Sequence, residues 1–202
     1  MKMFKIAAIA LACGLSRRMG SKNKLLMPFE GRRLFEYTLD QIAAVDFSEK
    51  IVVANERQIH QYAQKRGFLT VQNKEASTGR ASSLQAGIFS AVEADAYMFF
   101  NCDQPLLRGI TIKSLLAAFE RTNKIIVPKI FDRYGSPCIF PSRFREELLA
   151  LAGDKGGKIV YKKYPKEVEV VKFDDRTDFM DIDIEEDFSV VLEQNNLRGK
   201  NL

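Results

Sequence analysis

The sequence of 202 residues has few of the residues on which disulfide-linked and zinc-binding proteins depend. It contains three cysteines and a single histidine, His60, and no two cysteines have the spacing Cys-x-x-Cys. A small and odd number of cysteines excludes a disulfide scaffold, and a lone histidine argues against a zinc site. No apolar run approaches the roughly 18 residues that a membrane-spanning helix needs. We therefore expect a protein without a membrane partner.

An N-terminal export signal is also disfavoured. The run Ile6–Ala12, between Lys5 and Cys13, resembles the apolar core of a short lipoprotein signal. Such cores span about 7–15 residues, so this run is at the lower limit. Cleavage before Cys13 would also remove what we expect to be a buried strand. We therefore expect a cytoplasmic protein.

The charged residues are distributed unevenly along the chain. In total, 31 basic and 26 acidic residues give a net charge of +5. Residues 1–33 contain eight basic residues and one acid, whereas residues 174–187 contain eight acids and one arginine. The first stretch is suited to an anion, and the second could hold a cation, although most of its acids are typical of a solvated surface. A nucleic-acid surface would need basic residues spread along one face with aromatic residues between them, so we expect no nucleic-acid partner.

Apolar runs alternate with helical patterns along most of the chain. Strands are expected at Ile6–Ala12, Ile51–Ala54, Leu69–Gln72 and Ala96–Asn101, and helices at residues 34–45, Glu56–Arg66, residues 84–92 and Thr111–Phe119. This order predicts an α/β domain of three layers, α/β/α, with helices on both faces of a mostly parallel, twisted sheet. The strands Ile125–Phe131 and Ser136–Phe140, joined by a turn at Asp132–Gly135, predict a hairpin in the C-terminal part.

The remaining elements complete a single domain over residues 1–194. Helices are expected at Phe144–Leu151, Lys158–Lys163 and Ile184–Gln194, and a strand at Glu167–Lys172. Asp183 is a candidate cap for the last helix, with Glu186 completing a capping box. We expect residues 195–202 to be a frayed tail.

Ligands of an open parallel sheet bind beyond the carboxyl ends of its strands. The loop after the first strand is small and basic, because Cys13 and Gly14 are followed by Arg18 and Lys24. Small residues let the backbone approach a ligand closely, and the two cations could bracket phosphate charge. The loop matches neither the Gly-x-Gly-x-x-Gly fingerprint nor the Walker loop. A solvated basic loop remains the alternative.

The same loop carries a family resemblance. Leu11–Gly20, followed by Asn23-Lys24-Leu25-Leu26, resembles the opening motif of the MobA/MocA-like NTP transferases, which attach CMP or GMP to molybdopterin. Further segments resemble the same family in the same order: Gly79–Ile88, Cys102-Asp103-Gln104-Pro105, Gly135-Ser136-Pro137, Gly153–Gly156 and Asp181–Asp187. The match extends from Ile6 to Phe188. Gln104 and the closing Asp-Ile-Asp favour the molybdenum cofactor cytidylyltransferase branch.

The resemblance implies a Rossmann-like nucleotidyltransferase fold and a set of roles. Catalytic roles fall on Arg18, Lys24 and Asp103, and a magnesium ion would be held by Asp103 and Asp183, with Asp181 as a substitute for Asp183. Nucleotide contacts fall on Leu11, Ala12, Cys13, Gly14, Ser16, Arg18, Lys24, Asn73, Gly79 and Ser83. The alternatives are purely structural roles, with Asp103 forming a turn and Asp183 capping a helix.

The implied reaction is a magnesium-dependent transfer of CMP from CTP to molybdopterin or a related phosphorylated acceptor, with release of pyrophosphate. Alternatives in the same class use GTP, or a sugar or alcohol phosphate as acceptor. An alternative in another class is a non-catalytic factor that binds the cofactor and hands it to a molybdenum hydroxylase. Ala81, Cys102 and Ser136 favour this last alternative, because the family usually has Ser, Gly and His there.

Two further departures concern a cysteine and a lysine. Cys13 stands where the family usually has Ala or Gly, and a side chain there suits the cytidylyl branch; Lys158 stands where an Arg is common. Cys13 and Cys102 end two strands that we expect to be neighbours, which raises the hypothesis of a redox-sensitive pair. Two buried, inert thiols are the alternative.

Overall fold

The computed structural model describes residues 4–14 and 23–199. Strands in these ranges are β1 (Ile6–Ala12), β2 (Pro28–Phe29), β3 (Arg32–Arg33), β4 (Glu49–Ala54), β5 (Leu69–Val71), β6 (Ala96–Asn101), β7 (Ile125–Ile130), β8 (Arg133–Tyr134), β9 (Cys138–Pro141) and β10 (Val168–Phe173). The α-helices are α1 (Leu34–Ala43), α2 (Arg57–Gln64), α3 (Arg80–Ser90), α4 (Gly109–Thr122), α5 (Arg145–Leu149), α6 (Lys158–Lys163) and α7 (Glu185–Gly199). None of these helices combines the length and apolar character that crossing a membrane requires.

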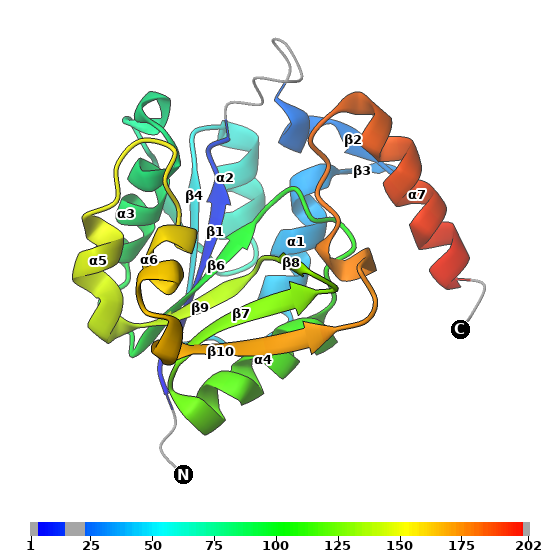
Figure 1. Cartoon of the computed structure of the whole chain (residues 1–202). Coiled ribbons are helices and arrows are strands. Elements are labelled where there is room, and N and C mark those ends of the chain that lie inside the picture. The colour runs from blue at the N-terminus through cyan, green and yellow to red at the C-terminus, as the bar shows by residue number, and fades with distance from the viewer. Residues whose placement is uncertain (1–3, 15–22, 200–202) are drawn as a thin grey trace.

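The main sheet confirms the predicted α/β architecture. Its strand order in the described residues is β10-β7-β9-β6-β1-β4-β5, with β8 added to β7. β1 pairs in parallel with both β4 and β6, and β4 pairs in parallel with β5. β9 is antiparallel to both of its neighbours, β6 and β7. The carboxyl ends of β1 and β6 therefore lie side by side at one edge of the sheet (Figure 1).

Two hydrophobic clusters hold helices against the two faces of this sheet. One cluster joins β1, β4 and β6 to α1, α2 and α4, and the other joins the opposite sides of the same strands to α3, α5 and α6. The alternation is visible in β1, where Ala8 belongs to the first cluster and Ile9 to the second. Because both faces are covered, the strands are continuous apolar runs, as parallel strands in three-layer domains usually are.

The hairpin of the C-terminal part is more irregular than predicted. β7 and β9 are antiparallel, but the expected turn at 132–135 contains the short strand β8, which folds back on β7. β9 begins at Cys138 rather than Ser136 and lies between β7 and β6. The position of β9 inside the sheet depends on pairing across the chain and not on the local pattern.

The C-terminal helix extends beyond the predicted boundary. We expected a frayed tail from residue 195, but α7 continues to Gly199. Its contacts explain the difference: Phe188 lies 6.4 Å from Phe29 between ring centroids, and the Asn195 side chain donates to Glu30 at 2.7 Å. α7 therefore packs beside β2, as Figure 1 shows. Residues 200–202 lie outside the described residues.

Candidate active site

The site begins where β1 and β6 end. Asp103 follows β6, and Lys24 opens a short 3-10 turn, Lys24–Leu26, whose cap is the Asn23 side chain. The Lys24 ammonium donates to Asp103 Oδ2 at 2.7 Å, to the Ile182 carbonyl at 2.7 Å and to Asp183 Oδ1 at 2.8 Å. Residues far apart in the sequence thus meet around one nearly buried cation.

Electrostatics keep this lysine charged. Burial disfavours the ammonium, but the carboxylates of Asp103 and Asp183 outweigh this effect and raise the pKa of Lys24. Asp181 is close by, and its surroundings disfavour the charged form of its carboxyl group. Desolvation of its carboxyl, together with repulsion from Asp103 and Asp183, raises the pKa of Asp181 to about 7, although the residue as a whole is exposed. The neighbourhood carries three carboxyl groups and one ammonium, so negative charge is in excess.

Asp103 has the features of a metal ligand. Its Oδ1 atom is buried, and among the described residues it has no hydrogen-bond partner. A buried, unpartnered carboxylate oxygen is costly unless a cation or water completes it. No cluster of three or more His, Cys, Asp or Glu side chains able to hold a metal is found in the described residues. Asp103 and Asp183 nevertheless suffice for Mg²⁺, which commonly binds one or two carboxylates and takes its other ligands from water and phosphate.

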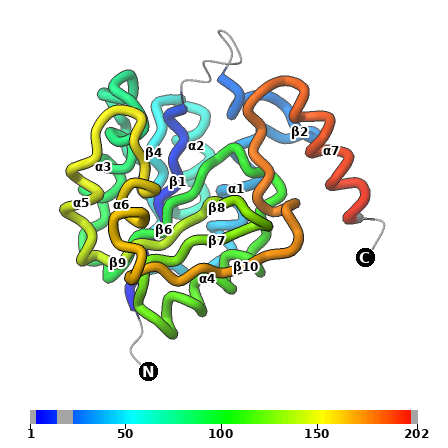
Figure 2. The backbone as a smooth tube through the Cα atoms, viewed as in Figure 1, coloured from blue at the N-terminus to red at the C-terminus, as the bar shows by residue number. Residues whose placement is uncertain are grey.

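Asp183 is delivered by the segment that joins β10 to α7, residues 174–184, which we call the crossing segment. It runs back alongside the loop that follows β6 (Figure 2), and the Ile182 N–H donates to the Asp103 carbonyl at 3.0 Å. The predicted capping role of Asp183 is wrong. α7 begins at Glu185, and the side chain of Asp187, not Glu186, accepts from the backbone N–H groups of Asp183 and Ile184.

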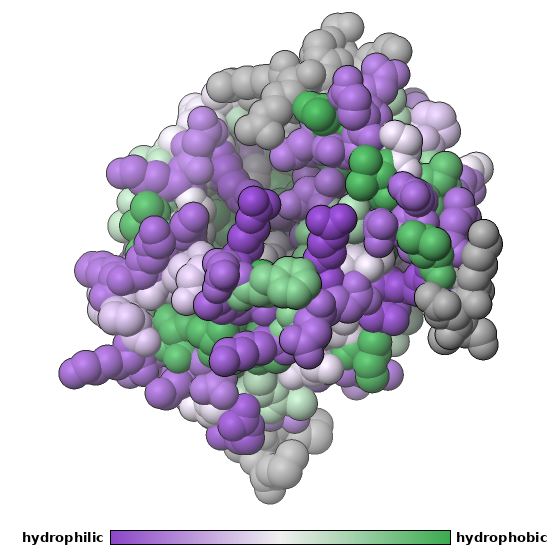
Figure 3. Space-filling view, turned by 45° about the vertical axis from the view of Figure 1, so that its right-hand side comes forward, coloured by the Kyte–Doolittle hydropathy of each residue, from purple (hydrophilic) through white to green (hydrophobic). Residues whose placement is uncertain are grey.

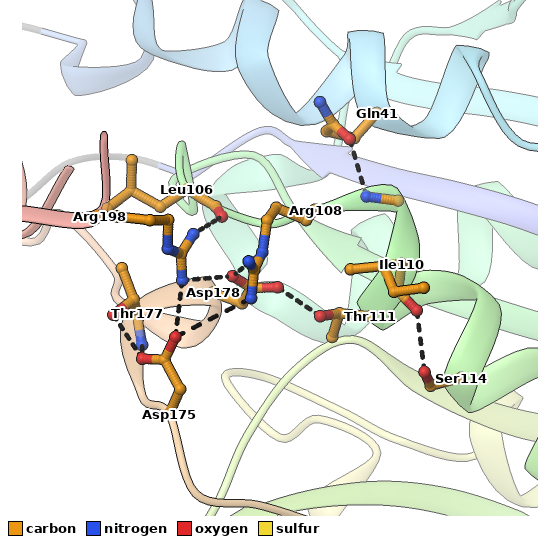
Figure 4. Close-up of polar contacts among 11 residues, drawn as sticks. Gln41, Leu106, Arg108, Ile110, Thr111, Ser114, Asp175, Thr177, Asp178 and Arg198 are labelled. Atoms are coloured by element: carbon orange, nitrogen blue, oxygen red, sulfur yellow. Dashed lines mark hydrogen bonds and ion pairs between the residues drawn. The ribbon is translucent and has the colours of Figure 1, made fainter. Parts of the chain in front are cut away.

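A buried carboxylate anchors the crossing segment (Figure 4). Asp178 is 2% exposed, accepts hydrogen bonds from Arg108 at 2.8 Å and from the Thr111 hydroxyl, and forms an ion pair with Arg198 at 2.7 Å. Arg198, near the end of α7, also pairs with Asp175 at 3.0 Å. The prediction that these acids are a solvated surface is therefore wrong for Asp178, because three donors from α4, α7 and the loop before α4 converge on it.

A cleft of about 360 Å³ opens above the Lys24 cluster. Of the residues predicted to contact a nucleotide, those lining it are Leu11, Cys13, Gly14, Lys24, Gly79 and Ser83, and the predicted metal ligands Asp103 and Asp183 line it as well. A Cβ added at Gly14 would meet no atom of the described residues within 4 Å, so these residues leave the backbone there open to a ligand. Ala12 is buried in the core and does not line the cleft. Ser16 and Arg18 lie outside the described residues.

Asn73 and Gly79 support the wall of this cleft. The Asn73 amide donates to Ser82 Oγ at 2.9 Å and Ser83 Oγ at 3.0 Å and accepts from the Glu75 N–H at 3.0 Å, so its side chain organises the loop. Gly79 has φ +118°, and a Cβ on it would lie 2.3 Å from the carbonyl carbon of Gly153. Only glycine allows this approach.

A second compartment of about 1000 Å³ adjoins the cleft. The two share Arg80, Asn101, Asp154 and Asp183. Sequence reasoning missed Arg80, which donates to the Asn101 side chain at 2.6 Å and stands between the two spaces. Its position directly after Gly79, at the start of a helix, was the available signal. Hydrophilic side chains dominate the face shown in Figure 3.

The second compartment is lined by aromatic residues and by charged residues of both signs. Its aromatic lining residues are Phe99, Phe131, Tyr134, Phe140, Tyr161 and Phe179, its basic ones are Arg80, Arg133, Lys158 and Arg176, and its acidic ones are Asp132, Asp154, Asp181, Asp183 and Asp187. Ser136 lines it too, whereas Ala81 is buried in the core, so the departure at position 81 removes nothing from this compartment.

The two cysteines of the redox hypothesis end neighbouring strands, as expected, but pack on different faces. Cys102 belongs to the cluster beneath α1, α2 and α4, and Cys13 packs against the cluster beneath α3, α5 and α6. Burial raises the pKa of both thiols, that of Cys13 to about 11. Neutral thiols on opposite faces favour the inert alternative.

Two curated proteins illustrate the similarity of this chain to known sequences. A nicotine blue oxidoreductase from Paenarthrobacter nicotinovorans is 25% identical over 188 residues, covering 88% of this chain and 92% of its own length. A molybdenum cofactor guanylyltransferase from Shewanella baltica (strain OS185) is 30% identical over 168 residues, covering 79% of this chain and 82% of its own length.

Solved structures share the fold. The Rv0371c protein of Mycobacterium tuberculosis H37Rv superposes with a TM-score of 0.78 at 25% identity, covering 94% of this chain and 98% of that one. A complex of that protein with manganese gives a TM-score of 0.73 at 21% identity, with coverage of 94% and 98%. The family model for the MobA-like NTP transferase domain matches residues 8–168. The chain therefore belongs to the family of MobA-like NTP transferases, and at this level it is a nucleotidyltransferase.

Proposed function

We propose that the protein transfers CMP from CTP to molybdopterin or a related phosphorylated acceptor and releases pyrophosphate. The observation that carries the proposal is the convergence of Lys24, Asp103 and Asp183 beneath an open cleft, with Asp103 Oδ1 buried and unpartnered among the described residues. Alignment of phosphates and neutralisation of their charge are what nucleotidyl transfer chiefly needs from a protein.

Asp103 and Asp183 would hold a divalent ion, Mg²⁺ or Mn²⁺. The manganese complex of the mycobacterial protein with the same fold supports this assignment. When bound, such an ion neutralises negative charge on the phosphate oxygens and makes the α-phosphorus more electrophilic. The cluster of Asp103, Asp181 and Asp183 around a single lysine leaves the negative charge that a divalent ion would balance.

The chemical step exchanges one phosphorus–oxygen bond for another. An ionised phosphate oxygen of the acceptor attacks the α-phosphorus of the nucleotide, and the bond to the bridging oxygen breaks as pyrophosphate leaves. No general base is required, because the attacking oxygen is already ionised at neutral pH. Arg80, which lines both compartments, would hold phosphate oxygens of both substrates. Gly14 leaves room for the phosphates against the backbone.

The preference for CTP rests on Cys13. Its thiol lines the smaller cleft beside Ser83, and the cleft of about 360 Å³ is modest for a nucleotide. A side chain at this position reduces the space for a base, which favours a pyrimidine over the larger purine of GTP. A Cys13→Gly variant tests this reading, because removing the side chain should shift the preference towards GTP.

The acceptor would occupy the larger compartment. The exposed rings of Phe131 and Tyr134 offer stacking surfaces. Arg133, Lys158 and Arg176 offer positive charge, although aspartates line the compartment as well. A flat ring that carries a phosphate, such as the pterin of molybdopterin, matches this combination better than a small alcohol phosphate.

The test is calorimetric titration of the protein with CTP, GTP and ATP, each with and without Mg²⁺, beside Asp103→Asn and a control, Glu169→Gln. Glu169 lies on β10, where it pairs with Arg121 of α4, and it does not line either compartment. We expect CTP binding that Mg²⁺ strengthens, that Asp103→Asn weakens at least tenfold and that Glu169→Gln leaves unchanged. Binding of no nucleotide would overturn the proposal and favour a non-catalytic carrier for a molybdenum hydroxylase.

A second measurement examines turnover. Incubation with CTP, Mg²⁺ and purified molybdopterin should release pyrophosphate in proportion to acceptor consumed. Nucleotide binding without pyrophosphate release from this acceptor, but with release from a sugar phosphate or an alcohol phosphate, would move the protein to the alternative substrate class.

A further inference from the structure

The hydrogen bonds of Lys24 leave its ammonium with no hydrogen to offer to a nucleotide. An ammonium has three hydrogens, and Asp103, the Ile182 carbonyl and Asp183 each accept one. The distances of 2.7–2.8 Å are those of strong, charge-assisted hydrogen bonds. The residue is 8% exposed, so water competes little with these contacts. This arrangement differs from the role that the sequence predicted for Lys24, which was to reach the phosphates.

The ammonium also lies where a metal ion would be expected. Lys24 Nζ is held between Oδ2 of Asp103 and Oδ1 of Asp183, and these are the two carboxylates available to a divalent ion. A divalent ion on the unpartnered Oδ1 of Asp103 would share that carboxylate group with the ammonium. Two positive ions cannot share such a small space, because their mutual repulsion inside a protein is large. Without either cation, the two carboxylates would repel each other.

We propose that Lys24 is the resident counter-ion of the metal site, and that its ammonium and a divalent ion occupy the Asp103–Asp183 pair in alternation. The ammonium of Lys24 would leave the carboxylate pair when a divalent ion binds there, and the phosphates of a bound nucleotide would provide it with new acceptors. Metal and nucleotide therefore both favour the state in which Lys24 has left the two carboxylates. Each ligand should thus strengthen the binding of the other. The identity of the nucleotide in this inference rests on the proposed function, whereas the exchange of the ammonium for a divalent ion does not.

The backbone around Lys24 suits such an exchange by the side chain alone. The Asn23 side chain accepts from the Leu25 N–H at 3.1 Å and donates to Glu56 at 3.3 Å, which fixes the start of the turn. Leu25 is 3% exposed and anchors the turn in the core. The four-carbon stem of Lys24 is the mobile part, and it lines the cleft into which phosphates would enter.

The expected size of the effect follows from population arithmetic. When a competent state is populated only to a fraction, the apparent affinity falls by that fraction. Three strong hydrogen bonds would keep the site in the lysine-occupied state for all but roughly a tenth of the molecules or fewer. Removing the ammonium should therefore increase the affinity for metal alone by about tenfold or more.

The experiment is a titration with Mn²⁺ alone, followed by the electron paramagnetic resonance signal of the free ion. Wild-type protein is compared with Lys24→Gln and with Lys5→Gln, which removes the same charge near the opposite end of β1, where Lys5 pairs with Glu93. We expect Lys24→Gln to bind Mn²⁺ about tenfold tighter than wild type, and Lys5→Gln to match wild type. Equal or weaker Mn²⁺ binding by folded Lys24→Gln would overturn the exchange.

A second arm uses the unmodified protein, in case Lys24→Gln does not fold. The Mn²⁺ affinity of wild type is measured with and without CTP, and we expect CTP to tighten it by about tenfold, with a reciprocal effect of Mn²⁺ on CTP. Independent binding of the two ligands would overturn the exchange. Failure of wild type to bind any nucleotide would overturn the proposed function instead, while the Mn²⁺ titration of Lys24→Gln would still decide the role of the lysine.

Discussion

Replacing Asp178 by Asn tests whether the anchor of the crossing segment is as important as its contacts indicate. The substitution keeps the shape of the side chain and removes its charge, so the guanidinium groups of Arg108 and Arg198 lose their shared buried partner. Breaking a buried ion pair from one side typically costs about 3–5 kcal/mol. The Arg108 side chain is 46% exposed and Arg198 retains Asp175, so we expect the lower end, about 3 kcal/mol.

The assay is equilibrium unfolding in urea, with thermal unfolding as a check. For a domain of this size, about 3 kcal/mol corresponds to a fall in Tm of roughly 6–12 °C. The matched control is Asp175→Asn, because Asp175 binds the same Arg198 but is 56% exposed. An exposed pair contributes about 0–1 kcal/mol. If Asp178→Asn and Asp175→Asn lower the free energy of unfolding by similar amounts, the reasoning from burial is refuted.

Three further predictions use the same kind of measurement at other positions. Gly79→Ala should lower the free energy of unfolding in urea by about 2–4 kcal/mol, because its Cβ would collide with the Gly153 carbonyl. The control Gly14→Ala should stay within about 0.5 kcal/mol of wild type, and equal effects of the two would contradict the packing argument. Burial raises the pKa of Cys13 from 9.0 to about 11, so its thiol should react with iodoacetamide at pH 8 about 100-fold more slowly than in the urea-unfolded chain. Its contribution to the free energy of unfolding should decline as the pH rises from 9 towards 11. Equally fast labelling of the folded and unfolded chains would contradict this prediction. Phe140→Ala should lower the free energy of unfolding by about 3–5 kcal/mol, since the ring is 1% exposed, and a loss below 1 kcal/mol would show that the core can collapse around the gap.

The sequence was sufficient to predict the parallel half of the fold. The run Ile6–Ala12 has the same bounds as β1, and Ala96–Asn101 has the same bounds as β6. Both are buried on two faces, so the apolar character is continuous and their ends are sharp. β9 was harder to predict, because its insertion between β6 and β7 depends on long-range pairing that leaves no local pattern.

The candidate site was predicted in part for a similar reason. Motifs next to strand ends, such as Asp103 after β6, could be placed from the order of the elements alone. The partners of Lys24 could not, since its contact with Asp183 spans 159 residues. The burial of Asp178 was also hidden, because nothing in an acidic stretch distinguishes the one carboxylate that three distant donors surround. Ser16 and Arg18 remain predictions.

The 159-residue separation between Lys24 and Asp183 has a consequence for the order of folding during synthesis. β1, β4, β5 and β6 and the helices between them all precede residue 102, so they can assemble while the chain is still being made. The carboxylate of Asp183 and the guanidinium of Arg198 emerge from the ribosome only after all the strands of the main sheet. A nascent or truncated chain can thus have most of its sheet and still lack the acidic side of its site. Assembly of that site reports that the polypeptide has been made at least as far as α7.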